Sequence, residues 1–171
     1  MARVTVGPAS ALCGALALLI AVVGAAVADP APTREDTCYD PPAAPSTVAA
    51  LKPADAVLTI TSPRAGETLS TSGGVLTVDV EYWGPHLVEA GEARSIDEYH
   101  LAYLLDIGSM AYIGTLRPIP HCTTRAYTGA ATRATFRNVG SGVHTLSVLL
   151  VGSNDVAVNP PTVVTVTFMV K

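Results

Sequence analysis

Residues 142–151 read Gly-Val-His-Thr-Leu-Ser-Val-Leu-Leu-Val, and this stretch decides the fold class. Leu146, Val148 and Leu150 share one parity, which is the period-two pattern of a strand with one buried face. Turn sequences rich in Gly, Ser and Asn flank the stretch on both sides. Because a strand cannot bury a face alone, the rest of the chain must supply a facing sheet.

The same alternation recurs along most of the chain. Both faces of the 98–107 segment are fairly apolar, which favours a central place in a sheet. About seven short strands with Gly and Pro between them are typical of an antiparallel β-sandwich. We therefore predict an all-β sandwich over residues 57–171, with no further domain after Lys171. The expected strands are 57–61, 75–82, 98–107, 110–113, one centred on 134–136 within residues 126–139, 142–151 and 162–170.

The N-terminus has the pattern of a secretory signal. Arg3 is followed by an uncharged apolar run over residues 9–28, which ends in the small residues Ala26-Val27-Ala28. This pattern predicts a signal peptide over residues 1–28 and a secreted or extracytoplasmic protein with no stable membrane insertion. The alternative is an uncleaved membrane anchor, since the run approaches the ~20 residues that a spanning helix needs.

Residues 29–56 are rich in Pro and Ala, which indicates an extended, poorly packed lead-in to the sandwich. Removal of the signal would also remove Cys13 and leave Cys38 and Cys122. In an oxidising compartment such a pair most simply forms one disulfide. The competing interpretation is a reactive thiol at Cys122 beside His121.

Charge and motif spacing argue against several functions. The formal net charge is -4 and no run of Lys or Arg exists, so we expect no nucleic-acid partner. Residues 140–142 form a Gly-Ser-Gly turn without the spacing of a nucleophile elbow, so we expect no enzyme activity. No two histidines lie two to four residues apart, so we expect no metal site and no cofactor. The histidines are His86, His100, His121 and His144.

The best binding candidates lie at two predicted loops. Tyr82 and Trp83 end one strand, and aromatic side chains of this kind combine apolar area with a polar group. His86 follows them, and Asn154 and Asp155 lie in the loop after the 142–151 strand. Sandwich folds carry binding on loops held by a rigid frame, so these five residues form the predicted site. The alternative is that Tyr82 and Tyr103 belong to the core and Trp83 only caps one end.

Three segments together carry a resemblance to a known family. They are the turn Ser-Pro-Arg-Ala-Gly at residues 62–66, the strand at 142–148 and the closing strand at 166–170. Residues 57–171 resemble the immunoglobulin-like and fibronectin-type-III-like modules of bacterial and algal extracellular proteins. The resemblance implies adhesion, spacing or ligand binding.

Two departures from these modules are visible. The inter-sheet Cys pair and buried Trp of antibody domains are absent, since Cys38 precedes the first expected strand. Some similar modules carry His-x-His on the third strand as a metal site, where this chain has His100-Leu101-Ala102.

We expect a secreted, non-enzymatic binding or adhesion module that recognises an extracellular protein or polymer, such as a glycan, through its end loops. The first alternative is a structural or spacer component of a cell envelope or surface layer. The second is a small metal-handling protein that uses His100 and other histidines.

Overall fold

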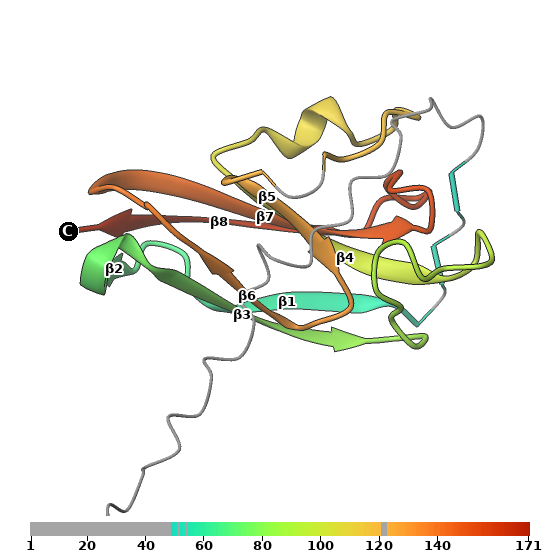
Figure 1. Cartoon of the computed structure of the whole chain (residues 1–171), viewed down its shortest axis with the longest axis horizontal. Helices are drawn as coiled ribbons and strands as arrows, with labels where there is room; N and C mark the ends of the chain where they lie inside the picture. Colours follow the sequence, from blue (N-terminus) through green and yellow to red (C-terminus); the bar gives the residue numbers. More distant parts are fainter. Residues whose placement is uncertain (1–48, 51, 54, 121–122) are drawn as a thin grey trace, which may run out of the picture. The chain divides into compact units, whose positions relative to one another are not determined.

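Eight β-strands in two sheets make up the described part of the chain (Figure 1). The computed structural model describes residues 49–50, 52–53, 55–120 and 123–171. The predicted signal peptide, most of the lead-in and both Cys38 and Cys122 lie outside these residues. The strands are β1 (Val57–Ser62), β2 (Thr68–Leu69), β3 (Leu76–Trp83), β4 (Tyr99–Leu105), β5 (Ala126–Gly129), β6 (Arg133–Phe136), β7 (Gly142–Gly152) and β8 (Val163–Val170).

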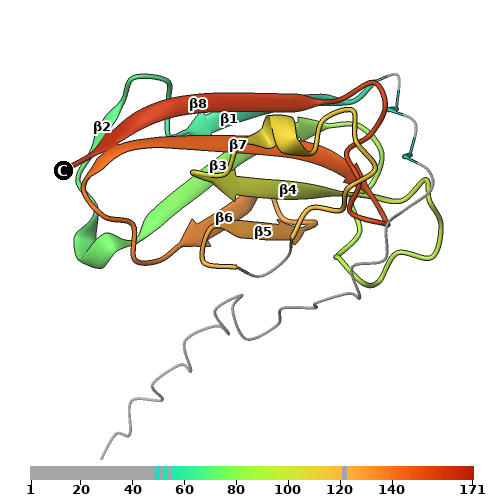
Figure 2. The ribbon, with the colours of Figure 1, turned by 90° about the horizontal axis from the view of Figure 1, so that it is seen from above.

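The two sheets lie face to face (Figures 1 and 2). One has three strands in the order β1-β3-β6, and the other has five in the order β2-β8-β7-β4-β5. Neighbouring strands are antiparallel, except that β2 pairs in parallel with β8. The predicted all-β antiparallel sandwich is therefore confirmed.

The core between the sheets follows the predicted alternation. Leu146, Val148 and Leu150 of β7 are fully buried, and their neighbours on β4 are equally inaccessible. From the opposite sheet, Val78 and Leu76 of β3 join the same cluster. Burying an aliphatic side chain of this size contributes about 1.5–3 kcal/mol, so this layer is a main source of stability.

The outer face of the five-stranded sheet is covered over β4 and the later part of β7. The segment between β4 and β5 lies across it (yellow in Figure 1), and packs Tyr112 and Ile119 against Leu104 and Leu149. Both faces of β4 are therefore buried, and all seven of its residues are inaccessible. The central position predicted for the 98–107 segment is confirmed, since β4 lies between β7 and β5.

Three details of the strand pattern differ from the prediction. The strand expected at 110–113 is wrong, because a 3-10 helix, η3 (Ser109–Ala111), directs the buried Tyr112 onto the sheet. The strand expected around residues 134–136 is present as β6, whereas β5, from the same 126–139 segment but in the other sheet, was not expected. The two-residue β2 was not expected, and it follows the turn at 62–66. A second 3-10 helix, η2 (Ser72–Gly74), separates β2 from β3.

Packing begins before β1. Ala50 is buried, and its carbonyl accepts a hydrogen bond from the N–H of Asn159 at 2.8 Å. The backbone N–H of Lys52 donates a hydrogen bond to the Asn159 carbonyl at 3.0 Å. These bonds attach the described end of the lead-in to the loop between β7 and β8. Within the described ranges, no helix has the length and apolar character needed to cross a membrane.

Candidate functional site

Trp83 is the most exposed aromatic side chain of the predicted site. It ends β3 and pairs with Val57 at the start of β1. The two residues are 73% and 56% exposed, and they lie side by side on the outer face of the three-stranded sheet. Trp83 points outward because it shares parity with Glu81, whereas the alternate residue Val80 points into the core.

The rest of this outer face is polar. The cross-strand pair Thr59 and Glu81 lies next to Trp83 and Val57. Beyond it, the guanidinium Nε of Arg133 lies 2.5 Å from Oδ1 of Asp79, and this carboxylate raises the pKa of Arg133. Trp83 and Val57 therefore form an apolar spot at the end of a polar, hydrogen-bonding face.

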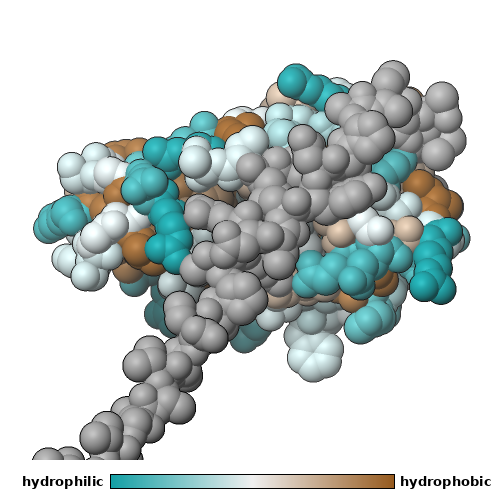
Figure 3. Space-filling view, viewed as in Figure 1, coloured by the Kyte–Doolittle hydropathy of each residue, from teal (hydrophilic) through white to brown (hydrophobic). Residues whose placement is uncertain are grey.

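Where Figure 3 shows the described residues, hydrophobic residues form small separate areas among hydrophilic ones. The other strongly exposed apolar side chains include Met110, which is 76% exposed on η3, and Val143, which is 65% exposed on β7.

Tyr82 points away from Trp83. Its hydroxyl is buried and has no hydrogen-bond partner among the described residues. Burial raises the pKa of Tyr82 to about 12, and the nearby charges of Asp55 and Tyr99 add to this effect. The hydroxyl packs so closely on Gly84 that a Cβ there would lie 2.5 Å from the oxygen. Tyr82 thus supports β3 from inside.

The other predicted site residues lie on the loops at the same end of the sandwich (right-hand end of Figure 1). His86 is exposed on the β3–β4 loop, and Asn154 is partly exposed on the β7–β8 loop. The two loops meet at Gly152. A Cβ added to this glycine would lie 3.3 Å from the Ile96 carbonyl oxygen of one loop and 3.3 Å from Asn154 Oδ1 of the other. The structure thus brings the loops together but leaves Asp155 in a different setting.

Asp155 forms a buried pair with His100 on the outer side of β4. The distance between His100 Nε2 and Asp155 Oδ1 is 2.6 Å, and the two side chains are only 1% and 6% exposed. The Asp155 carbonyl also accepts a hydrogen bond from the N–H of Ile119. These contacts tie the β7–β8 loop and the covering segment to β4. Asp155 therefore positions the loop, and it is too buried to contact a ligand directly.

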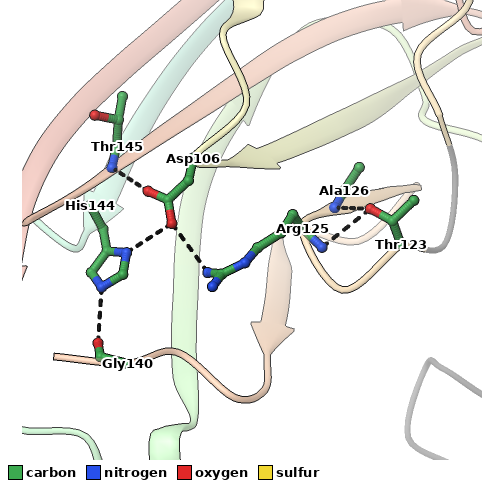
Figure 4. Close-up of polar contacts among 7 residues, drawn as sticks. All are labelled: Asp106, Thr123, Arg125, Ala126, Gly140, His144 and Thr145. Carbon is green, nitrogen blue, oxygen red and sulfur yellow. Dashed lines mark hydrogen bonds and ion pairs between the residues drawn. The ribbon is translucent and has the colours of Figure 1, made fainter. Parts of the chain in front are cut away.

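A second polar cluster lies at the opposite end of the sandwich (Figure 4). Asp106, which follows β4, accepts a hydrogen bond from the N–H of Thr145 at 3.0 Å. Its Oδ2 lies 2.9 Å from His144 Nδ1 and 3.2 Å from Arg125 Nη1. His144 Nε2 lies 2.9 Å from the carbonyl of Gly140. Both ring nitrogens of His144 thus lie within hydrogen-bond distance of an oxygen.

The Asp106 cluster joins β4, the start of β7 and the segment before β5, so its role is to hold these elements in register. In the described ranges, no three His, Cys, Asp or Glu side chains gather as a metal ion requires. The exposed Trp83 and the loops beside it form a surface that is open to contact from outside.

Comparison with known proteins names no family. No protein-family model matches the chain, and no curated protein matches it. Among solved structures, an engineered protein studied by the Northeast Structural Genomics Consortium is similar over 70% of this chain, with 15% sequence identity and a TM-score of 0.36. The match covers only 21% of that protein. A likeness this distant says nothing about function.

Two groups of residues escaped the sequence reasoning. Val57 was not predicted to lie beside Trp83, although the shared parity of Glu81 and Trp83 already places Trp83 on the polar face. The contact between Asp106 and His144 spans 38 residues and depends on the pairing register of β4 with β7. No local signal in the sequence reports it.

Proposed function

We propose that this chain is a secreted, non-enzymatic binding module of the immunoglobulin-like type, with Trp83 as its main contact residue. It recognises an extracellular polymer or protein at the end of the sandwich where Trp83 and the loops 84–98 and 153–162 lie. The observation that carries the proposal is the exposure of Trp83, 73%, beside the exposed Val57.

Trp83 and Val57 expose apolar area to water, and covering that area is favourable. Scattered single apolar residues are normal on a surface, but an indole beside a second exposed apolar side chain offers area that a ligand can cover. Trp83 is held by the pairing of β3 with β1, which extends to the Val57–Trp83 pair, while β6 pairs with β3 only at residues 76–79. The neighbouring Thr59 and Glu81 supply hydroxyl and carboxylate groups that suit a sugar or a polar peptide.

The immunoglobulin-like assignment is supported by the strand arrangement. The chain crosses from the first sheet to the second between β1 and β2, and β2 then runs parallel to the last strand. The secreted location rests on the apolar run at 9–28 and the small residues that end it.

The test is the substitution Trp83→Ala. Wild-type protein and variant are incubated with insoluble cellulose, chitin and xylan and with the secreted fraction of the source organism, and the retained protein is measured. We expect retention by one of these to fall at least tenfold in the variant, while the free energy of unfolding changes by less than about 0.5 kcal/mol, as is usual for an exposed residue.

Met110→Ala is the matched control, since Met110 is exposed to the same degree, 76%, on η3. This variant should bind like the wild type. Equal retention of wild type and Trp83→Ala would refute the role of Trp83. If no probe retains the wild type and Trp83→Ala instead loses stability, the proposal fails in favour of a structural spacer.

A further inference from the structure

The charges closest to Trp83 along the chain and the sheet are negative. Glu81 lies two residues before Trp83 on β3 and is exposed on the same outer face, about 7 Å along the strand. Asp55 is exposed in the turn before β1, and its charge acts on the neighbouring Tyr82. Among the described residues, neither Glu81 nor Asp55 forms an ion pair. The exposed pair of Trp83 and Val57 is therefore accompanied by negative charge that no basic side chain neutralises.

Arg133 is the single basic residue of the three strands β1, β3 and β6. Its Nε lies 2.5 Å from Oδ1 of Asp79, which lies two residues before Glu81 on β3. The guanidinium is thus held by Asp79 and does not pair with Glu81. The end of the sheet face that carries Trp83 keeps its negative charge.

The segments next to Trp83 add charge of the same sign. In residues 52–56 and 84–98 the basic residues are Lys52 and Arg94, and the acidic ones are Asp55, Glu89, Glu92, Asp97 and Glu98. At the opposite end of the sandwich the balance reverses. The basic residues there are Arg64, Arg125, Arg137 and Lys171, and the acidic ones are Glu67 and Asp106. A charge distribution of this kind attracts a cation to the end where Trp83 lies.

We propose that the surface of Trp83, Val57 and Glu81 binds an Arg- or Lys-bearing segment of a protein partner, with the cationic group over the indole ring. The inference rests on the proposed function and names the class of partner. A cation within about 6 Å of an indole is attracted by the negative face of the ring. A guanidinium stacks on the ring and presents five N–H donors, so it can contact the indole and the Glu81 carboxylate together, which favours Arg over Lys.

A neutral polysaccharide fits this surface less well. Among the described residues, Trp83 is the only strongly exposed aromatic side chain, so a chain of repeating sugar rings would find one ring to stack on. The negative charge around Trp83 would contribute nothing to the binding of a neutral ligand. A single cation needs only one aromatic ring, and the surrounding charge favours it.

The test is isothermal titration calorimetry of the purified chain with three probes: octa-arginine, octa-glutamate and chitohexaose. We expect octa-arginine to bind and the other two not to bind. Because the attraction between exposed charges is screened by salt, the affinity for octa-arginine should fall about tenfold or more between low salt and physiological salt.

Three substitutions separate the indole from general attraction to an acidic protein. Trp83→Leu keeps an apolar side chain but removes the aromatic ring, and it should weaken octa-arginine binding about fivefold. Glu81→Gln should weaken it about threefold, the size expected for one exposed ion pair. Glu67→Gln removes the same charge at the opposite end of the sandwich and is the matched control, so it should bind like the wild type. Circular dichroism checks that each variant is folded.

The possible failures are distinguishable. Octa-arginine binding that is unchanged in folded Trp83→Leu, or that falls equally in Glu81→Gln and Glu67→Gln, would overturn the inference. If chitohexaose binds through Trp83 and octa-arginine does not bind, the inference fails but the proposed function stands. If Trp83→Ala leaves the binding of every probe and every secreted partner unchanged, both fail.

Discussion

Removing the carboxylate of Asp106 should destabilise the sandwich far more than removing an equally exposed carboxylate elsewhere. The side chains of Asp106 and Asp79 are both 34% exposed. Among the described residues, the Asp79 carboxylate contacts Arg133, whereas the Asp106 carboxylate accepts a hydrogen bond from the N–H of Thr145 and lies against both His144 and Arg125. We therefore compare Asp106→Ala with Asp79→Ala.

The magnitude follows from these contacts. Loss of the backbone bond from Thr145 costs about 1 kcal/mol, and loss of the contact with the largely buried His144 costs about the same. The Arg125 pair is a third exposed and contributes no more than about 0.5 kcal/mol. Asp106 also has φ 58°, a left-handed conformation that costs Ala about 1 kcal/mol. The expected total is about 3 kcal/mol, against about 0.5 kcal/mol for Asp79→Ala.

Urea and thermal unfolding followed by far-ultraviolet circular dichroism measure this difference. At ~4 °C per kcal/mol, Asp106→Ala should lower Tm by about 12 °C and Asp79→Ala by about 2 °C. Asp106→Gly removes the same carboxylate but tolerates the left-handed conformation, so it should lie between the two. If the two alanine variants unfold at the same temperature, the contacts at Asp106 do not hold the strands as we describe.

Two further predictions concern pH. Burial raises the pKa of Tyr82 to about 12, so the stability that depends on its neutral form is present below about pH 10 and is lost as pH rises through about 12. Tyr82→Phe should flatten this alkaline loss of stability in urea unfolding from pH 9 to 12, and a loss as steep as in the wild type would contradict the burial of the hydroxyl. Hydrogen bonds from the backbone N–H of Arg94, and then from that of Ser95, lower the pKa of Glu98 below 4.5. The stability that these bonds give the folded state is therefore present above pH 4.5 and is lost as pH falls through the lowered pKa. Glu98→Gln should remove this acid dependence, and NMR titration of Glu98 at or above pH 4.5 would refute it.

Much of the fold was predictable because the buried strands alternate cleanly. Leu146, Val148 and Leu150 of β7 placed one face in the core, and the two apolar faces of 98–107 indicated a central strand. These signals are strong because burial on a pleated sheet requires one parity over several residues. The same reasoning failed at 110–113, because a short apolar run that covers a sheet from outside looks like a strand within it.

The candidate site was only partly predictable. Adjacent positions alternate between faces, so Tyr82 and Trp83 could not both point to solvent: the structure directs Tyr82 inward with a buried hydroxyl and exposes Trp83. The pairing of His100 with Asp155 joins residues 55 apart in the chain. Such contacts depend on loop conformation and strand register, which no local pattern in one sequence specifies.

The most direct test of the proposed function uses the fluorescence of Trp83, the only tryptophan in the chain. Because its indole is 73% exposed, acrylamide should quench the free protein readily. When the polymer or secreted partner that retains the wild type is added, we predict a shift of the emission to shorter wavelength and protection from quenching, in proportion to the bound fraction. Binding that leaves Trp83 as accessible to acrylamide as in the free protein would contradict the account, because the ligand would then occupy another surface.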